Sequence, residues 1–271
     1  MRQAEATMTS PILVTGGTGT LGRRLVPRLK KAGCDVRVLT RHSRADEGGV
    51  QFLTGDLATG AGIEPAVDGA RTIVHCAGGA KGDDEKTRTL VRAAARAGTP
   101  HLVSISVVGA DRIPIISGID RVMFGYFASK LAAEHVVATS GLPWTTLRAT
   151  QFHDTFLMVV QAMTKLPVIP VPAGFRFQPV DPDEVAARLV ELALDSSAGL
   201  VPDIAGPKIY TMADLLRLYL RARGKHRLLV PIWLPGKAAR AVRAGAILAP
   251  DRAVGHRTWE EFLADRVSPP R

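Results

Sequence analysis

A tyrosine and a lysine stand four residues apart in a segment whose apolar spacing predicts a helix over residues 126–139. On a helix this spacing brings the two side chains, Tyr126 and Lys130, to one face. An ammonium group beside a phenol stabilises the phenolate and lowers the pKa of the tyrosine, which then exchanges a proton with a carbonyl or alcohol oxygen. The same pair also occurs by chance on solvated helices, so the surrounding elements decide its meaning.

Two serines, Ser104 and Ser106, lie at the end of an apolar run that predicts a strand over residues 101–105. In open parallel sheets the ligand crevice lies at the carboxyl ends of the strands. Either hydroxyl is therefore a candidate to hydrogen-bond a substrate oxygen beside the tyrosine. The alternative is that both serines only cap a turn from strand to loop.

A glycine-rich segment, GGTGTLG over residues 16–22, follows a predicted strand at 11–15 and opens a predicted helix that ends at Gly33. Glycine lets the backbone turn tightly and leaves room for a pyrophosphate against the helix N-terminus, whose free N–H groups favour anions. This context indicates a dinucleotide site rather than a purely structural turn. Its candidate contact residues are Gly16, Thr18, Gly19, Thr20, Leu21 and Gly22.

The residues after the second predicted strand, 35–39, favour a phosphorylated cofactor. Proteins that bind NAD usually carry an acidic residue there for the ribose 2′-hydroxyl. This sequence has Arg41 instead, with Ser43 close behind it, and Arg23 follows the glycine loop. A guanidinium group suits a 2′-phosphate and stacks on adenine. The sequence therefore predicts NADP(H) in preference to NAD(H), the alternative being that the arginines are only solvated.

The elements that must position these residues alternate over the first 150 residues. Further apolar runs predict strands at 50–53, 71–76 and 144–147, and a helix is predicted over 84–97. Strands separated by helices pair in parallel through right-handed crossovers, and largely apolar strands fit a sheet covered on both faces. The predicted fold class is α/β, a doubly wound parallel sheet of the Rossmann type with a small C-terminal substrate cap.

The predicted division of the chain is a flexible tail over 1–10, a dinucleotide-binding core over 11–150, and a region over 151–271 that is mainly cap, with some segments returning to the core. Extended structure is expected at 166–172, helices at 183–194 and 212–223, and a terminal helix around Trp259 and Phe262. A helix over 236–243 carries three cations on one face, which suit an acidic substrate, a membrane surface, a partner or plain solvent.

The composition narrows the function classes. The chain has 271 residues, 46% of them hydrophobic, and its net charge of +10 at pH 7 is spread without a long basic run, so we expect no nucleic-acid partner. Two cysteines, Cys34 and Cys76, make no disulfide framework and indicate a reducing, cytoplasmic location. Neither a metal-ligand spacing nor an apolar stretch of about 20 residues is present. We expect a monomer or homodimer that binds a small-molecule substrate.

Together these segments resemble the short-chain dehydrogenase/reductase superfamily, in its extended or atypical branch near the NmrA-like NAD(P)-binding proteins. The resemblance rests on residues 14–22, 55–57, 74–78, 103–109, 126–130 and 144–148. It implies that Asp56 and Leu57 contact the adenine, that Ala77 and Gly78 line the cofactor near the ribose, and that Lys130 also holds the nicotinamide ribose.

The residues past the last predicted strand complete the expected site. The resemblance implies that Gln151 and Phe152 contact the nicotinamide or the substrate, and His153 is a further candidate that either faces the substrate or lies in the core. Two features depart from the family pattern. The segment Val-Ser-Ile-Ser at 103–106 replaces a double serine, and Gly79 and Ala80 stand where typical members have an asparagine.

The sequence as a whole predicts an NADP(H)-dependent oxidoreductase that reduces a carbonyl, a quinone or a related acceptor through a Ser/Tyr/Lys site. Two alternatives stay open. One is a protein that binds the cofactor without turnover, as a redox sensor or an assembly subunit. The other is an epimerase or isomerase that retains its cofactor.

Overall fold

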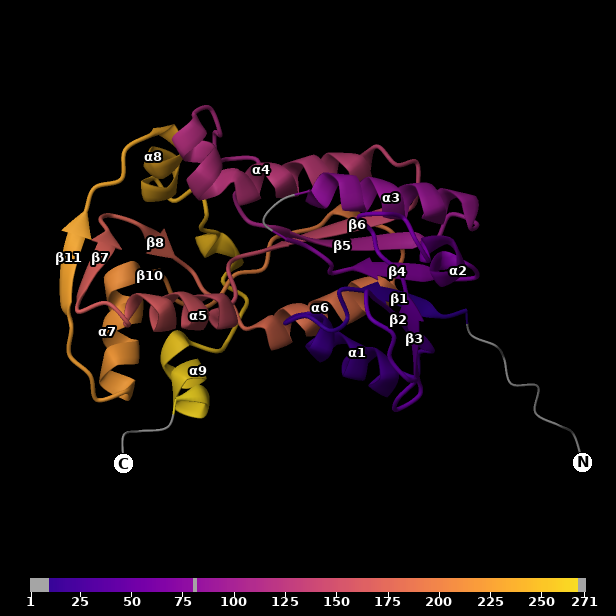
Figure 1. The fold of residues 1–271 in the computed structure, drawn as a ribbon, viewed down its shortest axis with the longest axis horizontal. Coiled ribbons are helices and arrows are strands. Elements are labelled where there is room, and N and C mark those ends of the chain that lie inside the picture. The colour runs from indigo at the N-terminus through magenta and orange to yellow at the C-terminus, as the bar shows by residue number, and fades with distance from the viewer. Residues whose placement is uncertain (1–9, 80–81, 268–271) are drawn as a thin grey trace, which may run out of the picture.

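The computed structural model describes residues 10–79 and 82–267 (Figure 1). Residues 1–9 of the expected flexible tail, and Ala80 of the departure noted above, lie outside the described residues. Within them a parallel sheet runs in the order β3-β2-β1-β4-β5-β6-β9. Its strands are β1 Ile12–Thr15, β2 Val36–Thr40, β3 Val50–Thr54, β4 Thr72–His75, β5 His101–Val107, β6 Trp144–Ala149 and β9 Gly199–Leu200. This topology confirms the predicted doubly wound α/β class.

The strand order reverses between β1 and β4, which are hydrogen-bonded neighbours although two strands separate them in the sequence. Ligands bind at such a switch point, outside the carboxyl ends of the strands. Gly16 follows β1 and Cys76 follows β4, so the glycine loop lies at this point of the sheet.

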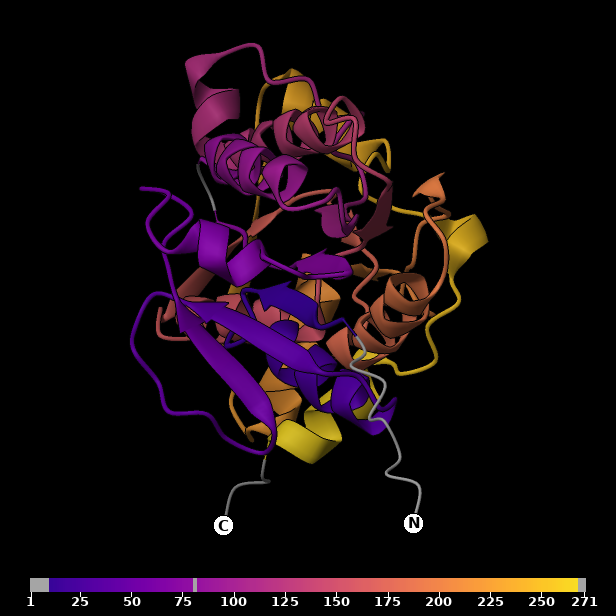
Figure 2. The same cartoon turned by 90° about the vertical axis from the view of Figure 1, so that its right-hand side faces the viewer.

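Helices cover both faces of the sheet, and Figures 1 and 2 show the two helical layers with the strands between them. On one face, α1 Gly22–Lys31 and α6 Pro182–Leu194 pack with strand residues such as Val14 and Val74. On the other, α2 Ile63–Val67, α3 Asp83–Arg96 and α4 Gly118–Ala138 cover Leu13 and Ile73. Because every central strand is buried on both sides, its sequence is apolar rather than alternating.

Helix α4 begins eight residues earlier than the predicted 126–139. A capping box sets its start. The Ser117 hydroxyl accepts a hydrogen bond from the Asp120 backbone N–H at 3.1 Å, and the Asp120 carboxylate accepts one from the Ser117 backbone N–H at 3.0 Å. The prediction relied on apolar periodicity, which the exposed aliphatic residues of the first two turns obscure.

The C-terminal region returns to the core in two places. Helix α6 packs on α1, and β9 pairs with β6 at Thr145 and Thr146. The prediction that the strand at 144–147 is the last strand of the sheet is therefore wrong, because β9 follows it. A two-residue strand such as β9 carries too few residues to show a period in the sequence.

The remaining elements build a smaller layer around a second apolar core. Its buried members include Phe156, Leu216, Trp259 and Phe262, so the terminal helix packs its aromatic rings inward as predicted. No described helix is long and apolar enough to cross a membrane. The elements of this layer are α5 His153–Met163, β7 Val168–Pro172, β8 Arg176–Phe177, β10 Tyr210–Thr211, α7 Met212–Ala222, β11 Leu228–Ile232 and α9 Trp259–Arg266. Helix α8 Lys237–Arg243 packs instead in a separate cluster with Phe124 of α4, and a 3₁₀ turn, Pro250–Arg252, follows it.

Candidate dinucleotide and proton-transfer site

A groove of about 570 Å³ opens at the switch point of the sheet, along the carboxyl ends of β1, β2 and β4. It brings together most of the predicted cofactor contacts from four separate segments. The lining residues are Thr15, Gly16, Thr18, Gly19, Leu39, Thr40, Arg41, His42, Gly55, Asp56, Leu57, Ala58, Cys76, Ala77, Gly78 and Lys86.

Glycine is required at two positions of the loop, because backbone atoms of other residues lie too close there to leave room for a Cβ atom. Gly16 has φ +70°, and a Cβ there would lie 2.6 Å from the backbone nitrogen of Ala77. A Cβ at Gly22 would lie 2.3 Å from the Gly16 carbonyl oxygen, so Gly22 lets α1 pack against the loop. No side chain caps the N-terminus of α1 and no acidic residue lies in its first turn. The loop therefore has the donors and the space that a pyrophosphate requires.

Three of the predicted cofactor contacts in the glycine loop do not line the groove. Thr20, Leu21 and Gly22 are not among the residues that line the groove, and Leu21 is buried in the core beneath the sheet. Only backbone N–H groups of this segment would then face an anion, as is usual at a helix N-terminus.

The part of the groove beside the end of β2 carries a cation that has no ion-pair partner in the described chain. Arg41 lines the groove, is exposed, and has no ion-pair partner within residues 10–79 and 82–267. Arg44, by contrast, pairs with Glu47 at 2.8 Å and lies 4.6 Å from the ring centre of Phe52. Ser43 and Arg23 are both exposed and are not among the lining residues of the groove. Arg41 is thus the cation beside the end of β2, while Lys86 of α3 is a second cation among the lining residues.

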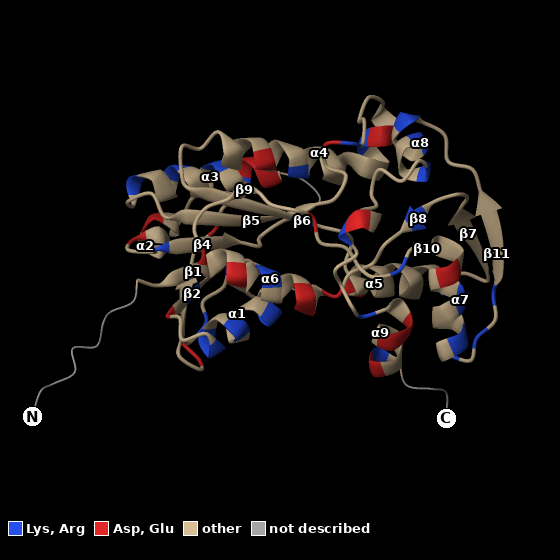
Figure 3. Cartoon of the chain, turned by 180° about the vertical axis from the view of Figure 1, so that it is seen from behind, with Lys and Arg blue, Asp and Glu red and all other residues tan. Residues whose placement is uncertain are grey.

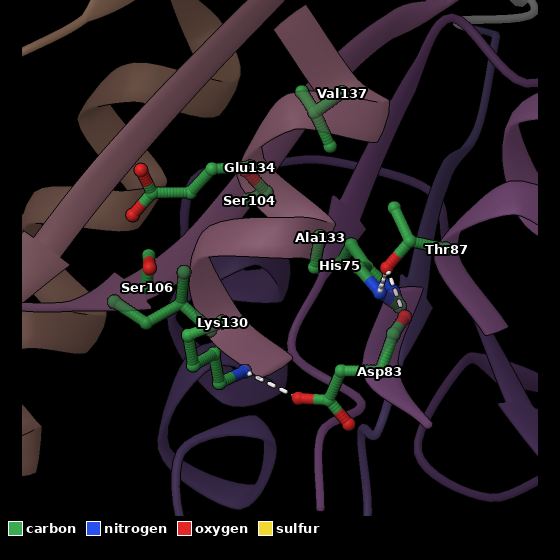
Figure 4. Close-up of a pocket in the computed structure, with 10 residues that line it drawn as sticks. His75, Asp83, Thr87, Ser104, Ser106, Lys130, Ala133, Glu134 and Val137 are labelled. Carbon is green, nitrogen blue, oxygen red and sulfur yellow. Dashed lines mark hydrogen bonds and ion pairs between the residues drawn. The ribbon is translucent and has the colours of Figure 1, made fainter. Parts of the chain in front are cut away.

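At the other end of the groove a buried ion pair joins α3 to α4 (Figure 4). The Lys130 Nζ atom lies 3.0 Å from Oδ2 of Asp83, and the side chains are 10% and 2% exposed. The second carboxylate oxygen of Asp83 accepts a hydrogen bond from the Gly79 backbone N–H at 2.7 Å. A Cβ at Gly78 would lie 2.7 Å from the lysine nitrogen. Lys130 therefore lies directly beside Gly78, which lines the groove, although Lys130 itself is not among the lining residues.

Asp83 is a site residue that the sequence reasoning missed. It is 47 positions from Lys130, and nothing in the local pattern links the two. The available signal was its place at the start of a predicted helix, immediately after the fourth strand and the glycines that follow it. The carboxyl ends of neighbouring parallel strands meet at one edge of the sheet, which brings such residues together.

Tyr126 lies one turn before Lys130 on α4, and the Lys130 Nζ atom is 5.8 Å from the centre of the phenol ring. The pKa of Tyr126 is raised above its usual value of about 10, chiefly because the hydroxyl loses hydration. The Lys130 charge lowers this pKa, while the Asp83 carboxylate raises it. The lowering that was expected from Lys130 is present, but lost hydration at the hydroxyl and the Asp83 carboxylate outweigh it, although Tyr126 as a whole residue is 40% exposed.

The two serines of β5 have different surroundings. The Ser104 Oγ atom hydrogen-bonds to the Thr146 Oγ1 atom of β6 at 2.7 Å, whereas the Ser106 hydroxyl is buried with no partner among the described residues. Both line a small cavity of about 10 Å³, together with Lys130 and Glu134 (Figure 4). A buried hydroxyl without a partner is costly, so Ser106 rather than Ser104 has unused hydrogen-bonding capacity, beside a cavity about the size of one water molecule.

An arginine on β6 fixes the rotation of α4. Arg148 donates from Nε and Nη2 to the two carboxylate oxygens of Glu134, at 2.9 and 2.6 Å, and pairs through Nη1 with Asp111 at 2.9 Å. A bidentate pair holds geometry better than a single contact does. Because Glu134 lies one turn beyond Lys130, this contact orients the Tyr126 and Lys130 face.

Of the residues after β6, Gln151 is a candidate ligand contact, whereas Phe152 and His153 pack in the apolar core. Gln151 has both polar atoms of its amide buried without a hydrogen-bond partner in the described chain, as expected of a group that a ligand satisfies. Phe152 packs partly against the sheet core. His153 is fully buried, with ring centres 5.0 Å from Phe262 and 5.9 Å from Trp259. The alternative of a core histidine therefore describes His153 better than a substrate contact does.

A second arginine, unnoticed in the sequence, ties the glycine loop to the C-terminal region. Arg24 donates to the Thr20 carbonyl oxygen at 2.7 Å, pairs with Asp154 of α5 at 3.1 Å, and pairs with Asp183 of α6 at 3.0 Å. Its side chain is only 12% exposed. The backbone of the loop is thus connected directly to two helices beyond residue 150.

The geometry of groove, loop and buried lysine defines a protein that binds a nicotinamide dinucleotide. A family model described as NAD(P)H-binding matches residues 16–195, so the chain belongs to this NAD(P)H-binding family. This match, together with the structural neighbours, confirms the suspected superfamily.

Individual proteins resemble this chain at low identity. The chain is 27% identical over 228 residues to the chloroplastic protein High Chlorophyll Fluorescence Phenotype 244 of Arabidopsis thaliana, covering 79% of this chain and 56% of that protein. It is 28% identical over 257 residues to a ceramide reductase of Caulobacter vibrioides, covering 88% and 77%. The fold matches NADPH-dependent quinone oxidoreductase QOR2 of Escherichia coli with a TM-score of 0.78, 19% identity, and 94% and 99% coverage. The chain thus spans little more than half of the Arabidopsis relative.

Proposed function

We propose that this protein is an NADP(H)-dependent oxidoreductase that reduces a carbonyl, a quinone or a related small acceptor. The observation that carries the proposal is the position of Lys130, which is buried where the dinucleotide groove meets the Tyr126 face of α4 and the free hydroxyl of Ser106. The reductases among the similar proteins support this class of reaction.

Each residue has a separate role in the proposed reaction. The reduced nicotinamide, when bound, supplies the hydride to the acceptor carbon. Ser106 hydrogen-bonds the acceptor oxygen, and Tyr126 gives it a proton. Lys130 holds the nicotinamide ribose and its charge favours proton loss from the phenol. A tyrosine with its usual pKa of about 10 is protonated at neutral pH, as a proton donor must be, and the raised pKa of Tyr126 keeps it so.

The cofactor preference rests on Arg41. A guanidinium at the end of β2, with no carboxylate holding it within the described chain, suits the 2′-phosphate of NADPH. Asp56 and Leu57 line the adenine end of the groove, and Gly78 lies against Lys130 near the expected ribose position. Gln151 supplies an unsatisfied amide for the nicotinamide or the substrate.

The test is to titrate the protein with NADPH and NADH by fluorescence, and then to follow NADPH consumption with panels of ketones, aldehydes and quinones. We expect tighter binding of NADPH and turnover of at least one acceptor. Tyr126→Phe should lower turnover by about 10² or more with unchanged NADPH affinity. Ser106→Ala should lower turnover more than the matched Ser104→Ala. Full turnover in Tyr126→Phe would show that the proposed proton donor is wrong.

A second candidate function is cofactor binding without turnover, as a sensor or an assembly subunit. It is favoured by the Lys130–Asp83 pair, which opposes the effect of the lysine on the Tyr126 phenol. It predicts tight NADPH binding with no consumption across the panels, and unequal affinities for the two redox forms if the protein is a sensor. A retained-cofactor epimerase predicts instead that nucleotide co-purifies with the protein.

The cellular setting is also a proposal. Cys34 and Cys76 are both free, and burial raises the pKa of each thiol, that of Cys76 to about 12. Unreactive buried thiols support a reducing, cytoplasmic location. Size-exclusion chromatography with light scattering would distinguish the two expected states, a monomer and a homodimer.

A further inference from the structure

Strands β7 and β11 form a small parallel sheet at the edge of the molecule farthest from β1, β2 and β3 (Figure 1). One of its faces packs inward, where Ile169 and Val171 are buried in the second apolar core. The register places Val168 beside Leu228 and Pro172 beside Ile232 on the opposite face. We call this outward surface, with the tryptophan that follows it, the apolar face: Val168, Pro170, Leu228, Val230, Ile232 and Trp233.

The apolar face departs from the usual pattern of a half-buried sheet. A sheet with one face on the core normally alternates apolar residues inside with polar residues outside. Here the outward positions are aliphatic as well, and Leu228 is 64% exposed and Trp233 is 68% exposed. Contiguous exposed apolar residues mark interaction sites in soluble proteins. Nothing in the chemistry proposed above uses this surface.

The two strands of the apolar face lie in stretches of the sequence that hold cations and no acidic residue, and the nearby Asp120 of α4 accepts a hydrogen bond from the Ala238 N–H of α8. The sequence holds no aspartate or glutamate between positions 155 and 180 or between 215 and 250, the two stretches that contain β7 and β11. Cations lie before β11 at Lys225 and Arg227, and after it on α8. Figure 3 shows Lys and Arg in blue on the segment leading into β11 and on α8, while the two strands are tan.

The helix cations identified in the sequence belong to this surface. Arg243 of α8 lies with its guanidinium carbon 4.0 Å from the ring centre of Trp233, and its Nη1 donates to the Leu234 carbonyl oxygen at 2.8 Å. Lys237 and Arg240 lie on the same helix and are exposed. The tryptophan is thereby held at the border between the aliphatic strip and the cations.

We infer that the apolar face docks on an anionic membrane surface without crossing it. Aliphatic side chains and tryptophan enter the boundary between headgroups and acyl chains, while lysine and arginine meet the lipid phosphates. A second copy fits less well, because an isologous dimer through this face would bring the same cations opposite one another. A nucleic acid would use the cations but not the exposed aliphatic strip.

The test is flotation of the full chain with vesicles of phosphatidylglycerol or of phosphatidylcholine. One variant removes the apolar contact, Leu228→Ser with Val230→Ser, and a second removes the charge, Lys225→Glu with Arg227→Glu. Matched controls lie elsewhere: Leu194→Ser with Val254→Ser at exposed apolar positions, and Lys31→Glu with Arg92→Glu on α1 and α3. Circular dichroism checks that each variant is folded.

We expect binding to phosphatidylglycerol at a lipid concentration at least tenfold lower than to phosphatidylcholine. Each variant of the face should raise that concentration at least fivefold, and each control less than twofold. Absence of flotation with phosphatidylglycerol would overturn the inference, as would equal loss in variants and controls. A dimer abolished by the same substitutions would assign the face to a second copy. Binding of an RNA oligonucleotide that tolerates the serine variant would assign it to nucleic acid.

Discussion

The ammonium group of Lys130 lies 3.0 Å from the carboxylate of Asp83, and this buried pair connects the first turn of α3 with the middle of α4. It holds the lysine at the end of the dinucleotide groove, against Gly78. It also places a negative charge close enough to raise the pKa of Tyr126. The strength of Tyr126 as an acid therefore depends on a residue that no local sequence pattern identifies.

Asp83→Asn should lower the pKa of Tyr126, because it removes a negative charge that disfavours the phenolate and leaves the Lys130 charge unopposed. The pKa is measured by phenolate absorbance, after subtraction of the same titration with Tyr126→Phe added. Asp84→Asn, on the next residue of α3, is the matched control and should leave the curve unchanged. An unchanged or higher Tyr126 pKa in Asp83→Asn would contradict this account.

Arg41→Ala should weaken NADPH binding by at least tenfold and leave NADH binding within twofold of the parent protein. Hydrogen bonds to a charged group contribute about 1.5–3 kcal/mol, which is roughly a factor of ten or more in Kd. Titration by fluorescence measures both constants. Arg23→Ala is the control, because Arg23 does not line the groove. Equal weakening for both nucleotides would mean that Arg41 does not read the 2′-phosphate.

Gly16→Ala should abolish NADPH binding and lower the free energy of unfolding by about 2 kcal/mol or more. The added Cβ would lie 2.6 Å from the backbone nitrogen of Ala77, so one of these two backbone segments would have to shift. Gly48 is the control: it also has positive φ, at +57°, but a Cβ there meets no atom within 4 Å. Gly48→Ala should cost only about 1 kcal/mol of backbone strain. Urea denaturation compares the two, and similar losses would speak against a steric role for Gly16.

Two buried histidines make the fold sensitive to acid. Burial lowers the pKa of His75 to about 3 and that of His153 to about 4, whereas an unfolded histidine ionises near 6.5. Below about pH 6.5 the unfolded chain thus binds protons that the native chain does not. The free energy of unfolding therefore decreases as the pH is lowered below 6.5, by about 1.4 kcal/mol per pH unit for each histidine.

His153→Phe should remove the share of this acid sensitivity that His153 contributes, about 2 kcal/mol between pH 7 and pH 5. His153 lies between aromatic rings and its nitrogens have no hydrogen-bond partner in the described chain, so no polar contact is lost. Urea denaturation at the two pH values measures the difference. His256→Gln, at a side chain 92% exposed, is the control. A pH dependence equal to that of the parent protein would contradict the role of His153.

The fold was predictable because its strands and helices each carry their own pattern. The glycine loop between β1 and α1 and the apolar strands on either side fix the sheet class. The sequence did not reveal β9, β8 or β10, since two-residue strands are made by their partners rather than by local propensity. It also missed the start of α4, although Ser117 and Asp120 have the spacing of a capping box.

Only those parts of the site whose residues lie close together in the sequence were predictable. Tyr126 and Lys130 share a helix face, so their spacing was informative. Asp83 and Arg24 act through partners 47 and more than 100 residues away, and only the crossovers of the sheet bring those partners close. The choice between Ser104 and Ser106 likewise depended on Thr146 of the neighbouring strand, which a single sequence does not pair with either.

The contact of Arg24 with Thr20, Asp154 and Asp183 has a thermodynamic consequence. Through it, the loop proposed to receive the pyrophosphate contacts α5, the helix that follows Gln151 and Phe152. If nucleotide binding shifts this arginine, the preferred position of α5 shifts with it. Thermodynamic linkage is reciprocal. If the nucleotide changes the affinity of a second molecule that binds against α5, that molecule changes the affinity for the nucleotide by the same factor.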